Sequence, residues 1–156
     1  MALKNVKYGD VFELATTMGM AYFQCVKETP VTESEIIRIF PGVYKDVISA
    51  KLDELAKQQE IFFVQFPVKY GVRKNVIKFV GNFNVPENTV VPKYYRDKHI
   101  VKGEFISWHI IDIQTLKIES VRELSEEHRK LSPAGMWNDT LLAERIAEGW
   151  TPEKWV

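Results

Sequence analysis

The chain has 156 residues, of which 46% are hydrophobic and 27% are charged. This is ordinary for a soluble globular protein, and we expect one domain over residues 1–156, long enough to bury a real apolar core. Its 21 Lys and Arg residues are balanced by 21 Asp and Glu residues, so no overall positive charge attracts anionic membranes or nucleic acid, which is disfavoured as the main partner.

The start of the chain lacks the apolar stretch of a signal peptide, and no run of residues approaches membrane-spanning length. Cys25 is the only cysteine, which excludes an intramolecular disulfide and a zinc site built from several cysteines. Together these features predict a cytoplasmic protein that is neither secreted nor inserted in a membrane.

A β-hairpin is predicted near the N-terminus. Two short apolar runs, residues 11–15 and 21–26, are separated by a small break of polar residues and glycine. Alternation in the second run places residues 21, 23 and 25 on one face and residues 22, 24 and 26 on the other. Cys25 is interpreted as a small buried side chain, because no nearby His or Lys is placed to lower the pKa of its thiol.

Residues 32–40 carry two conflicting patterns. Thr32 followed by Glu35 resembles a capping box, which favours a helix. The run at 36–40 is rich in β-branched residues and stops at Pro41, which favours a strand. We interpret this stretch as a strand.

A helix is predicted after this strand. Asp46 is a suitable N-cap, and Ile48, Leu52 and Leu55 fall at i, i+4 and i+7, where they form one apolar stripe. We expect this stripe to pack across the sheet.

Residues 62–67 and 72–82 form two apolar runs, rich in β-branched and aromatic residues, that are joined by a short polar link. This pattern predicts paired strands in the core, beneath the preceding helix. A proline-punctuated segment follows. We expect any function of this stretch to lie at this exit, residues 82–96.

Residues 105–112 predict a strand with Ile106, Trp108 and Ile110 on one face and His109 on the other. Residues 116–121 alternate as well and are expected to pair with it. His109, Asp112 and Glu104 are candidates for an acid–base cluster, but the alternation favours a solvated His109.

The C-terminal part predicts helices. Ser125 begins a short helix, and a last helix is capped by Asn138 or Asp139 and ends at Gly149. Trp137 and Trp150 bracket the last helix, so we expect them in the core unless they are exposed as anchors for a partner. The elements together predict an α+β fold: a twisted antiparallel sheet or partly open β-barrel, with a packed helix after the third strand and C-terminal helices.

No catalytic, cofactor or metal site is predicted. The three histidines lie too far apart in sequence for a local metal site, and the chain has no nucleophile elbow and no glycine-rich phosphate loop. A basic and aromatic set could bind single-stranded nucleic acid or an acidic protein, or form a solvated face. Its members are Arg73, Lys74, Lys78, Lys93, Arg96 and Lys98, with Tyr70, Tyr94 and Tyr95 among them.

The residues proposed for binding are mostly aromatic, with polar or charged neighbours, because aromatic anchors with a charged rim are typical of protein interfaces. They are Tyr94, Tyr95, Arg96, Trp108, Trp137 and Asn138.

Several short motifs form a distinctive set: the opening Gly9–Leu14 segment, the Ala21-Tyr22-Phe23-Gln24 strand, the Gly81-Asn82 turn and the proline-rich loop up to Tyr94. Together they resemble a bacterial family, immunity protein family twenty-six. Phe23 stands where the family usually has Gly. The resemblance covers about the first two-thirds of the chain. It implies a predominantly β fold without catalysis, whose members neutralise toxins of polymorphic and contact-dependent systems.

Three functional hypotheses follow. The first is a non-enzymatic immunity protein that occludes a cognate toxin, without a cofactor. The second is a small-ligand or nucleic-acid-binding module that uses the basic and aromatic loop. The third, kept only as a residual, is an enzyme built on His109 and Asp112.

Overall fold

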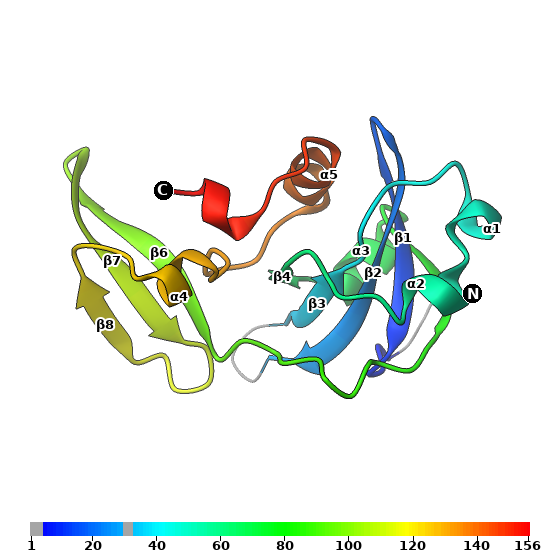
Figure 1. Ribbon diagram of the computed structural model, residues 1–156, viewed down its shortest axis with the longest axis horizontal. Helices are drawn as coiled ribbons and strands as arrows, with labels where there is room; N and C mark the ends of the chain where they lie inside the picture. Colours follow the sequence, from blue (N-terminus) through cyan, green and yellow to red (C-terminus); the bar gives the residue numbers. More distant parts are fainter. Residues whose placement is uncertain (1–4, 30–32) are drawn as a thin grey trace.

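The computed structural model describes residues 5–29 and 33–156. Its architecture is α+β, with two antiparallel sheets and several short helices (Figure 1). Sheet A is formed by β1 (Asp10–Thr16), β2 (Gly19–Glu28), β3 (Glu35–Ile39), β4 (Phe63–Phe66) and β5 (Lys78–Asn82), in the order β4-β3-β2-β1-β5. Sheet B is formed by β6 (Tyr94–Val101), β7 (Glu104–Asp112) and β8 (Ile118–Val121), in the order β6-β7-β8. The expected α+β class is confirmed, and the main sheet is open rather than closed into a barrel.

The predicted N-terminal hairpin is confirmed by the antiparallel pairing of β1 with β2. Its alternation also holds, because Phe23 and Cys25 belong to one apolar cluster while Tyr22 belongs to another, on the opposite face of sheet A. The side chain of Cys25 is only 2% exposed. Burial raises the pKa of this thiol well above its ordinary value, as expected for an inert packing residue.

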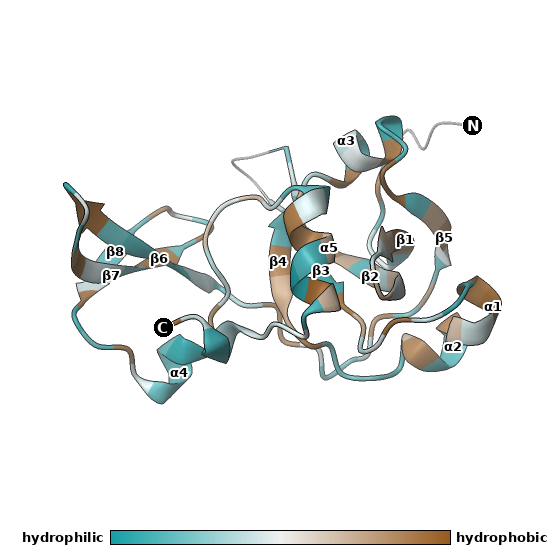
Figure 2. Ribbon diagram, turned by 90° about the horizontal axis from the view of Figure 1, so that it is seen from above, coloured by the Kyte–Doolittle hydropathy of each residue, from teal (hydrophilic) through white to brown (hydrophobic). Residues whose placement is uncertain are grey.

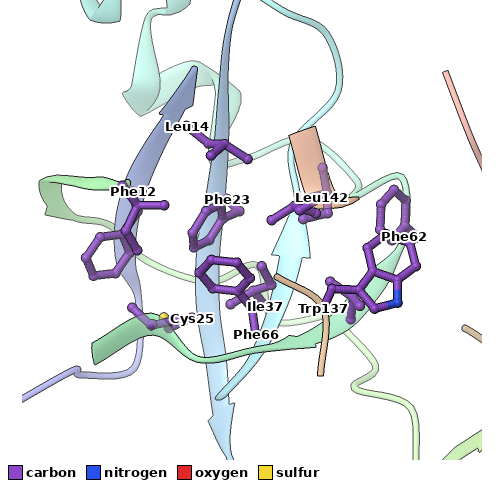
Figure 3. Packing of buried hydrophobic residues seen from close by; sticks show 13 residues of the cluster. Phe12, Leu14, Phe23, Cys25, Ile37, Phe62, Phe66, Trp137 and Leu142 are labelled. Carbon is purple, nitrogen blue, oxygen red and sulfur yellow. The ribbon is translucent and has the colours of Figure 1, made fainter. Parts of the chain in front are cut away.

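The main core lies between one face of sheet A and helix α5 (Asp139–Ala147). Phe12, Phe23 and Phe66 come from three strands and pack ring against ring, with centroid separations of 5.7 Å for Phe12–Phe23 and 5.5 Å for Phe23–Phe66. Leu142 of α5 is fully buried and lies against the same strands (Figure 3). The ring pairs join strands of sheet A, and burial of Leu142 in the same cluster holds the helix to the sheet.

The ends of α5 match the predicted helix. Asn138 is its N-cap, and the Oδ1 atom of Asn138 accepts a hydrogen bond from the N–H of Leu141 at 2.7 Å. Trp137 and Trp150 flank the helix and meet edge to face at 5.2 Å, and both rings contact Phe62. The expectation that these two tryptophans belong to the core is therefore confirmed.

The helix predicted after the third strand is two short helices, α1 (Val47–Ala50) and α2 (Leu52–Leu55). Lys51 between them has a left-handed backbone with φ of 51°. In one continuous helix Ala50 and Leu52 would point in nearly opposite directions, yet both are buried against the second face of sheet A. The break brings them together and leaves Ile48 84% exposed, so the predicted stripe is wrong at Ile48 and correct at Leu52 and Leu55.

The two strands predicted within residues 62–82 exist as β4 and β5, but they are not paired. They lie at opposite edges of sheet A, where β4 pairs with β3 and β5 pairs with β1. The link between them contains an unpredicted helix, α3 (Val68–Arg73). Gly71 in this helix lies so close to the side chain of Ile77 that a Cβ atom would come within 3.0 Å of it. This close contact explains why glycine occupies the position, although glycine has a low helix propensity.

Sheet B stands at one end of the molecule, away from α1, α2 and α3 (Figures 1 and 2). A connecting segment, residues 132–137, joins the edge strands of the two sheets. Along β6 the N–H of Arg96 donates to the carbonyl of Ser132, and the N–H of Ala134 donates to the carbonyl of Arg96. Along β4 the N–H of Trp137 donates to the carbonyl of Gln65 at 2.9 Å. These bonds fix sheet B to sheet A.

The predicted pairing of residues 105–112 with 116–121 is confirmed as β7 and β8. Strand β6 was not predicted, because its charged residues do not show the apolar alternation of a half-buried strand. Short helix α4 (Glu126–Arg129) begins at Ser125 as expected, and a 3-10 turn, Pro152–Lys154, lies near the C-terminus. Within the ranges 5–29 and 33–156, no helix is both long and apolar enough to cross a membrane.

Residues 35–39 form strand β3, as interpreted from the sequence, while Thr32 of the alternative capping box lies outside the described residues. Glu35 is buried, and its carboxylate accepts backbone hydrogen bonds from Val68 and Lys69 at the start of α3. Its Oε1 atom has no hydrogen-bond partner. Burial raises the pKa of Glu35 above its ordinary value of 4.5, although Lys69 and the two backbone bonds oppose this.

The buried Glu35 is expected to make the stability of the fold depend on pH. Because the folded state binds the Glu35 proton more tightly than the unfolded chain, stability from this group is present below pH 4.5 and is lost as the pH rises through the raised pKa. We therefore expect Glu35→Gln to increase the free energy of unfolding, relative to the unchanged chain, more at pH 8 than at pH 4. Urea denaturation at both pH values measures this difference. An equal effect at the two pH values would contradict the prediction.

Candidate functional site

The structure does not bring the six proposed binding residues together on one surface. Tyr95, Arg96, Trp108 and Trp137 are buried, whereas Tyr94 and Asn138 are exposed. Trp137 lies in the core under α5, and Asn138 caps that helix. The other four residues belong to β6 and β7 of sheet B.

Tyr95 and Arg96 are consecutive in β6 and therefore point to opposite faces of sheet B. Tyr95 packs into an apolar cluster between the two sheets, together with Phe63 of β4 and Ile113. Arg96 lies on the other face, which is covered by the C-terminal residues. Sheet B thus has one face toward sheet A and one face held by distant parts of the chain.

Arg96 is fully buried and is held by carbonyl groups from two distant segments. Its Nε donates to the carbonyl of Leu131 at 2.9 Å, and its Nη2 donates to the carbonyls of Arg129 and Pro152 at 3.2 and 2.6 Å. Hydrogen bonds from a charged donor are stronger than those between neutral groups. Arg96 therefore ties the region of α4 and the C-terminal turn to β6.

The guanidinium group of Arg96 also packs against two tryptophan rings that contact each other. Its Cζ is 4.7 Å from the ring centre of Trp108 and 4.8 Å from that of Trp155, and the two rings meet edge to face at 5.0 Å. Burial and the nearby positive charge of Arg129 lower the pKa of Arg96 to about 10. Arg96 consequently remains charged at neutral pH and makes cation–π contacts with both rings.

The outer end of sheet B carries exposed apolar residues. Lys102 and Gly103 form the turn between β6 and β7, both with positive φ, as in the tight turns that suit hairpins. Ile100, Val101, Phe105 and Ile106 flank this turn and are between 41% and 53% exposed. These four residues are called the hairpin tip below. Large neighbouring apolar residues that remain exposed are a feature of binding surfaces.

The hairpin tip is connected to Trp108, the buried member of the tryptophan pair. A β-bulge between His99 and Ile100 shifts the register, so Ile100 is paired with Phe105. The ring of Phe105 then meets that of Trp108 edge to face at 5.8 Å. Through Trp108 and Arg96, the hairpin tip is held by the same contacts that fix the C-terminal residues.

The proposed acid–base cluster is not assembled. His109 stacks on His99 with ring centres 4.6 Å apart, whereas Asp112 lies three positions further along β7, on the other face. Although burial raises it, the pKa of Asp112 is lowered overall, because the N–H groups of Gln114 and Thr115 and the ammonium group of Lys93 stabilise the carboxylate. Glu104 lies at the opposite end of β7, beside the turn.

The basic and aromatic set is divided between separate places. Arg73 and Lys74 lie over the ring of Tyr70 on α3, whereas Lys93 lies over Tyr94 at the start of β6. Arg96 is unable to contact a phosphate backbone because it is fully buried. In the described part of the chain, no group of three or more His, Cys, Asp or Glu side chains is arranged to hold a metal ion.

Two cavities lie near the predicted exit segment. One, of about 450 Å³, is formed by residues 82–87 together with Tyr8, Ala56 and Lys57. The other, of about 250 Å³, lies between the two sheets and is lined by Tyr95. The first is open and has a mixed polar and apolar lining, and the second is largely apolar.

Sequence reasoning missed the hairpin tip, although one signal for it was present. Lys102-Gly103 is a turn dipeptide flanked on both sides by apolar pairs, Ile100-Val101 and Phe105-Ile106, which is the pattern of a short hairpin. The charged residues before Ile100 lack the apolar alternation that would have predicted strand β6. In comparisons with protein-family models, curated proteins and solved structures, nothing matches this chain.

Proposed function

We propose that this protein binds another protein and acts by covering it, with the hairpin tip as the centre of the contact surface. The observation that carries the proposal is the exposure of four apolar residues around one hairpin turn: Ile100 and Phe105, which form a cross-strand pair, and their neighbours Val101 and Ile106. The ring of Phe105 rests on that of Trp108, which supports the hairpin. Interfaces typically have an apolar and aromatic centre with a charged rim. Lys98, Lys102 and Glu104 supply that rim here.

The partner we propose is a bacterial protein toxin, and the role is that of a cytoplasmic immunity protein. Support comes from the resemblance of the Gly9–Leu14, Gly81-Asn82 and proline-loop motifs to immunity protein family twenty-six. Occlusion needs only surface complementarity, so it requires no cofactor and no catalytic group on this chain. A rigid apolar hairpin is suited to enter a cleft on the partner, where its aromatic ring acts as an anchor.

Replacing Phe105 with Asp is expected to abolish protection of cells that express the cognate toxin. Burying a carboxylate where the partner accommodates an aromatic anchor reduces the binding free energy by more than about 2 kcal/mol, which weakens binding by at least roughly 30-fold. The test expresses the chain together with the product of a toxin gene adjacent to its own gene and measures survival. Binding of the purified proteins gives the affinity directly.

Ile48→Asp is the matched control, because Ile48 is also an exposed apolar residue but lies on α1, at the other end of the molecule. Ile48→Asp should unfold at nearly the same urea concentration as the unchanged chain, and Phe105→Asp at a slightly lower one, because it loses the ring contact with Trp108. Loss of protection in Ile48→Asp and not in Phe105→Asp would place the contact surface elsewhere. Failure of the unchanged chain to protect against any neighbouring toxin would refute the immunity role.

A further inference from the structure

Strand β8 leaves one edge of sheet B open (Figure 1). The outer edge of β6 is hydrogen-bonded to connecting segment 132–137, whereas β8 has a neighbour, β7, on one side only. Within residues 5–29 and 33–156, neither a strand nor an isolated bridge pairs with the other side of β8. Ile118, Glu119 and Ser120 are exposed. An uncovered strand edge of this kind can accept a further strand.

The register of β8 determines which of its backbone groups bond to β7. The N–H of Asp112 donates to the carbonyl of Lys117 at 3.0 Å, and the antiparallel register places these two residues opposite each other. Hydrogen-bonded pairs recur at every second residue of an antiparallel ladder. Glu119 and Val121 therefore direct their N–H and C=O groups toward β7.

The other two residues of β8 direct their backbone groups outward. Ile118 and Ser120 alternate with the residues that bond to β7, so their N–H and C=O groups point away from it. They present two donors and two acceptors, separated by roughly 7 Å along the strand. The backbone of an extended segment carries matching groups at the same spacing. The open edge of β8 is therefore complementary to one added strand.

Glu119 distinguishes between a second copy of this chain and a different partner. Two copies use all the outward groups when Ile118 of each copy pairs with Ser120 of the other. This register places Glu119 directly opposite the same residue of the second copy, in a pair whose Cα atoms are about 4.5 Å apart. Like charges directly opposite each other destabilise a sheet, whereas opposite charges stabilise it. Glu119 thus disfavours self-pairing and favours a segment with a positive charge at that position.

We propose that an extended segment of a protein partner adds to β8 as a fourth strand of sheet B, antiparallel like the others, with a Lys or Arg opposite Glu119 and an apolar residue opposite Ile118. The side chain of Ile118 is 56% exposed, so an apolar side chain beside it removes apolar surface of both from water. This edge is distinct from the hairpin tip, and the inference does not depend on the proposed toxin role.

The test uses a synthetic peptide, acetyl-Thr-Thr-Val-Thr-Lys-Ile-Thr-Thr-amide, whose Lys and Ile lie opposite Glu119 and Ile118 in the antiparallel register. A second peptide has Glu in place of Lys. Titrations follow the backbone amide NMR signals of Ile118 and Ser120 in the full chain. The Lys peptide is expected to shift both signals saturably at millimolar concentration and to bind about five-fold more tightly than the Glu peptide. Glu119→Lys should reverse this preference.

Ser120→Pro should abolish binding of both peptides, because it removes an outward N–H that does not bond to β7 and is therefore tolerated at an edge. Ser120→Ala is its control and should bind like the unchanged chain. The proposal is overturned if neither peptide shifts the two signals, or if Glu119→Lys leaves the order of the peptides unchanged. It is also overturned if the two signals move on dilution of the chain alone, since a second copy would then occupy the edge.

Discussion

Replacing Arg38 with methionine is expected to lower the free energy of unfolding by about 3–5 kcal/mol. This is the usual loss when a buried charged side chain is removed and the groups paired with it stay buried. Arg38 is fully buried in β3. Its Nε donates to Oε1 of Gln24 at 2.7 Å, and its Nη atoms donate to the carbonyls of Gln58 and Ala56 at 2.9 and 2.5 Å. Methionine fills much of the volume but leaves these acceptors without a donor.

The loss at Arg38 should spread across sheet A. The Nε2 of Gln24 itself donates to the carbonyls of Gly9 and Phe83, so Arg38 orients a side chain that holds two further loops. Burial lowers the pKa of Arg38, while Glu60, 3.6 Å away, opposes this. Urea denaturation followed by far-UV circular dichroism measures the stability of the whole fold.

Arg145→Met is the control for Arg38→Met. Arg145 also pairs with a carboxylate, that of Glu148 at 2.9 Å, but it does so at the surface of α5. Surface pairs of this kind contribute little, so the change should stay within about 0.5 kcal/mol. A similar loss in both variants would show that buried hydrogen bonding is not what makes Arg38 important.

Replacing Arg96 with methionine is the second large effect, expected to cost about 3 kcal/mol, since it leaves the carbonyls of Leu131, Arg129 and Pro152 without a donor. This loss should be local. The C-terminal turn and the ring of Trp155 are held to sheet B through Arg96, so they should loosen before sheet A unfolds. Hydrogen exchange of β6 and near-UV circular dichroism of the tryptophans report this region.

Two comparison variants show what Arg96 contributes. Arg96→Lys keeps the positive charge but loses the fork of donors that reaches separate carbonyls, so most of the loss should remain. Lys98→Met removes a cation that lies 5.3 Å from the same Trp108 ring but is only partly buried, and its effect should be much smaller. Full recovery in Arg96→Lys would mean that charge, rather than donor geometry, holds the C-terminal turn.

Arg96→Met also connects the fold to the proposed function. The hairpin tip rests on Trp108 through Phe105, and Trp108 rests on Arg96. If the hairpin must be rigid to enter a partner, this variant should bind the toxin more weakly although no contact residue has changed. Phe105→Asp, by contrast, should abolish binding with a much smaller loss of stability than Arg96→Met, so the two variants separate the support of the hairpin from its direct contact with the toxin.

Local patterns predicted much of sheet A and both ends of the chain. Apolar runs across a short break identified β1 and β2, β-branched content identified β3, and alternation identified β7, because these patterns depend only on residues close in the chain. Capping chemistry located α4 and α5, because Ser125 and Asn138 satisfy N–H groups only three residues away. The fold class followed from these elements.

The candidate binding residues were harder to place, and the reason differs from residue to residue. Trp137 was correctly expected in the core because it borders an amphipathic helix. Tyr95 and Arg96 were expected in an exposed loop, since a charged segment rich in tyrosine has the composition of a surface. Burying Arg96 is possible only because three carbonyls converge on it from residues 129, 131 and 152.

The sequence by itself determined which residues alternate, which side chains cap helices and which class of fold results, because these properties depend on neighbours within a few positions. Only the tertiary structure decided that β4 and β5 occupy opposite edges of sheet A, that Arg96 packs against Trp108 and Trp155, and that the apolar hairpin tip remains uncovered. The physical reason is that the periodicity of apolar and polar residues predicts which face of an element is buried, but not which other segment packs against that face. That choice depends on packing between residues far apart in the chain.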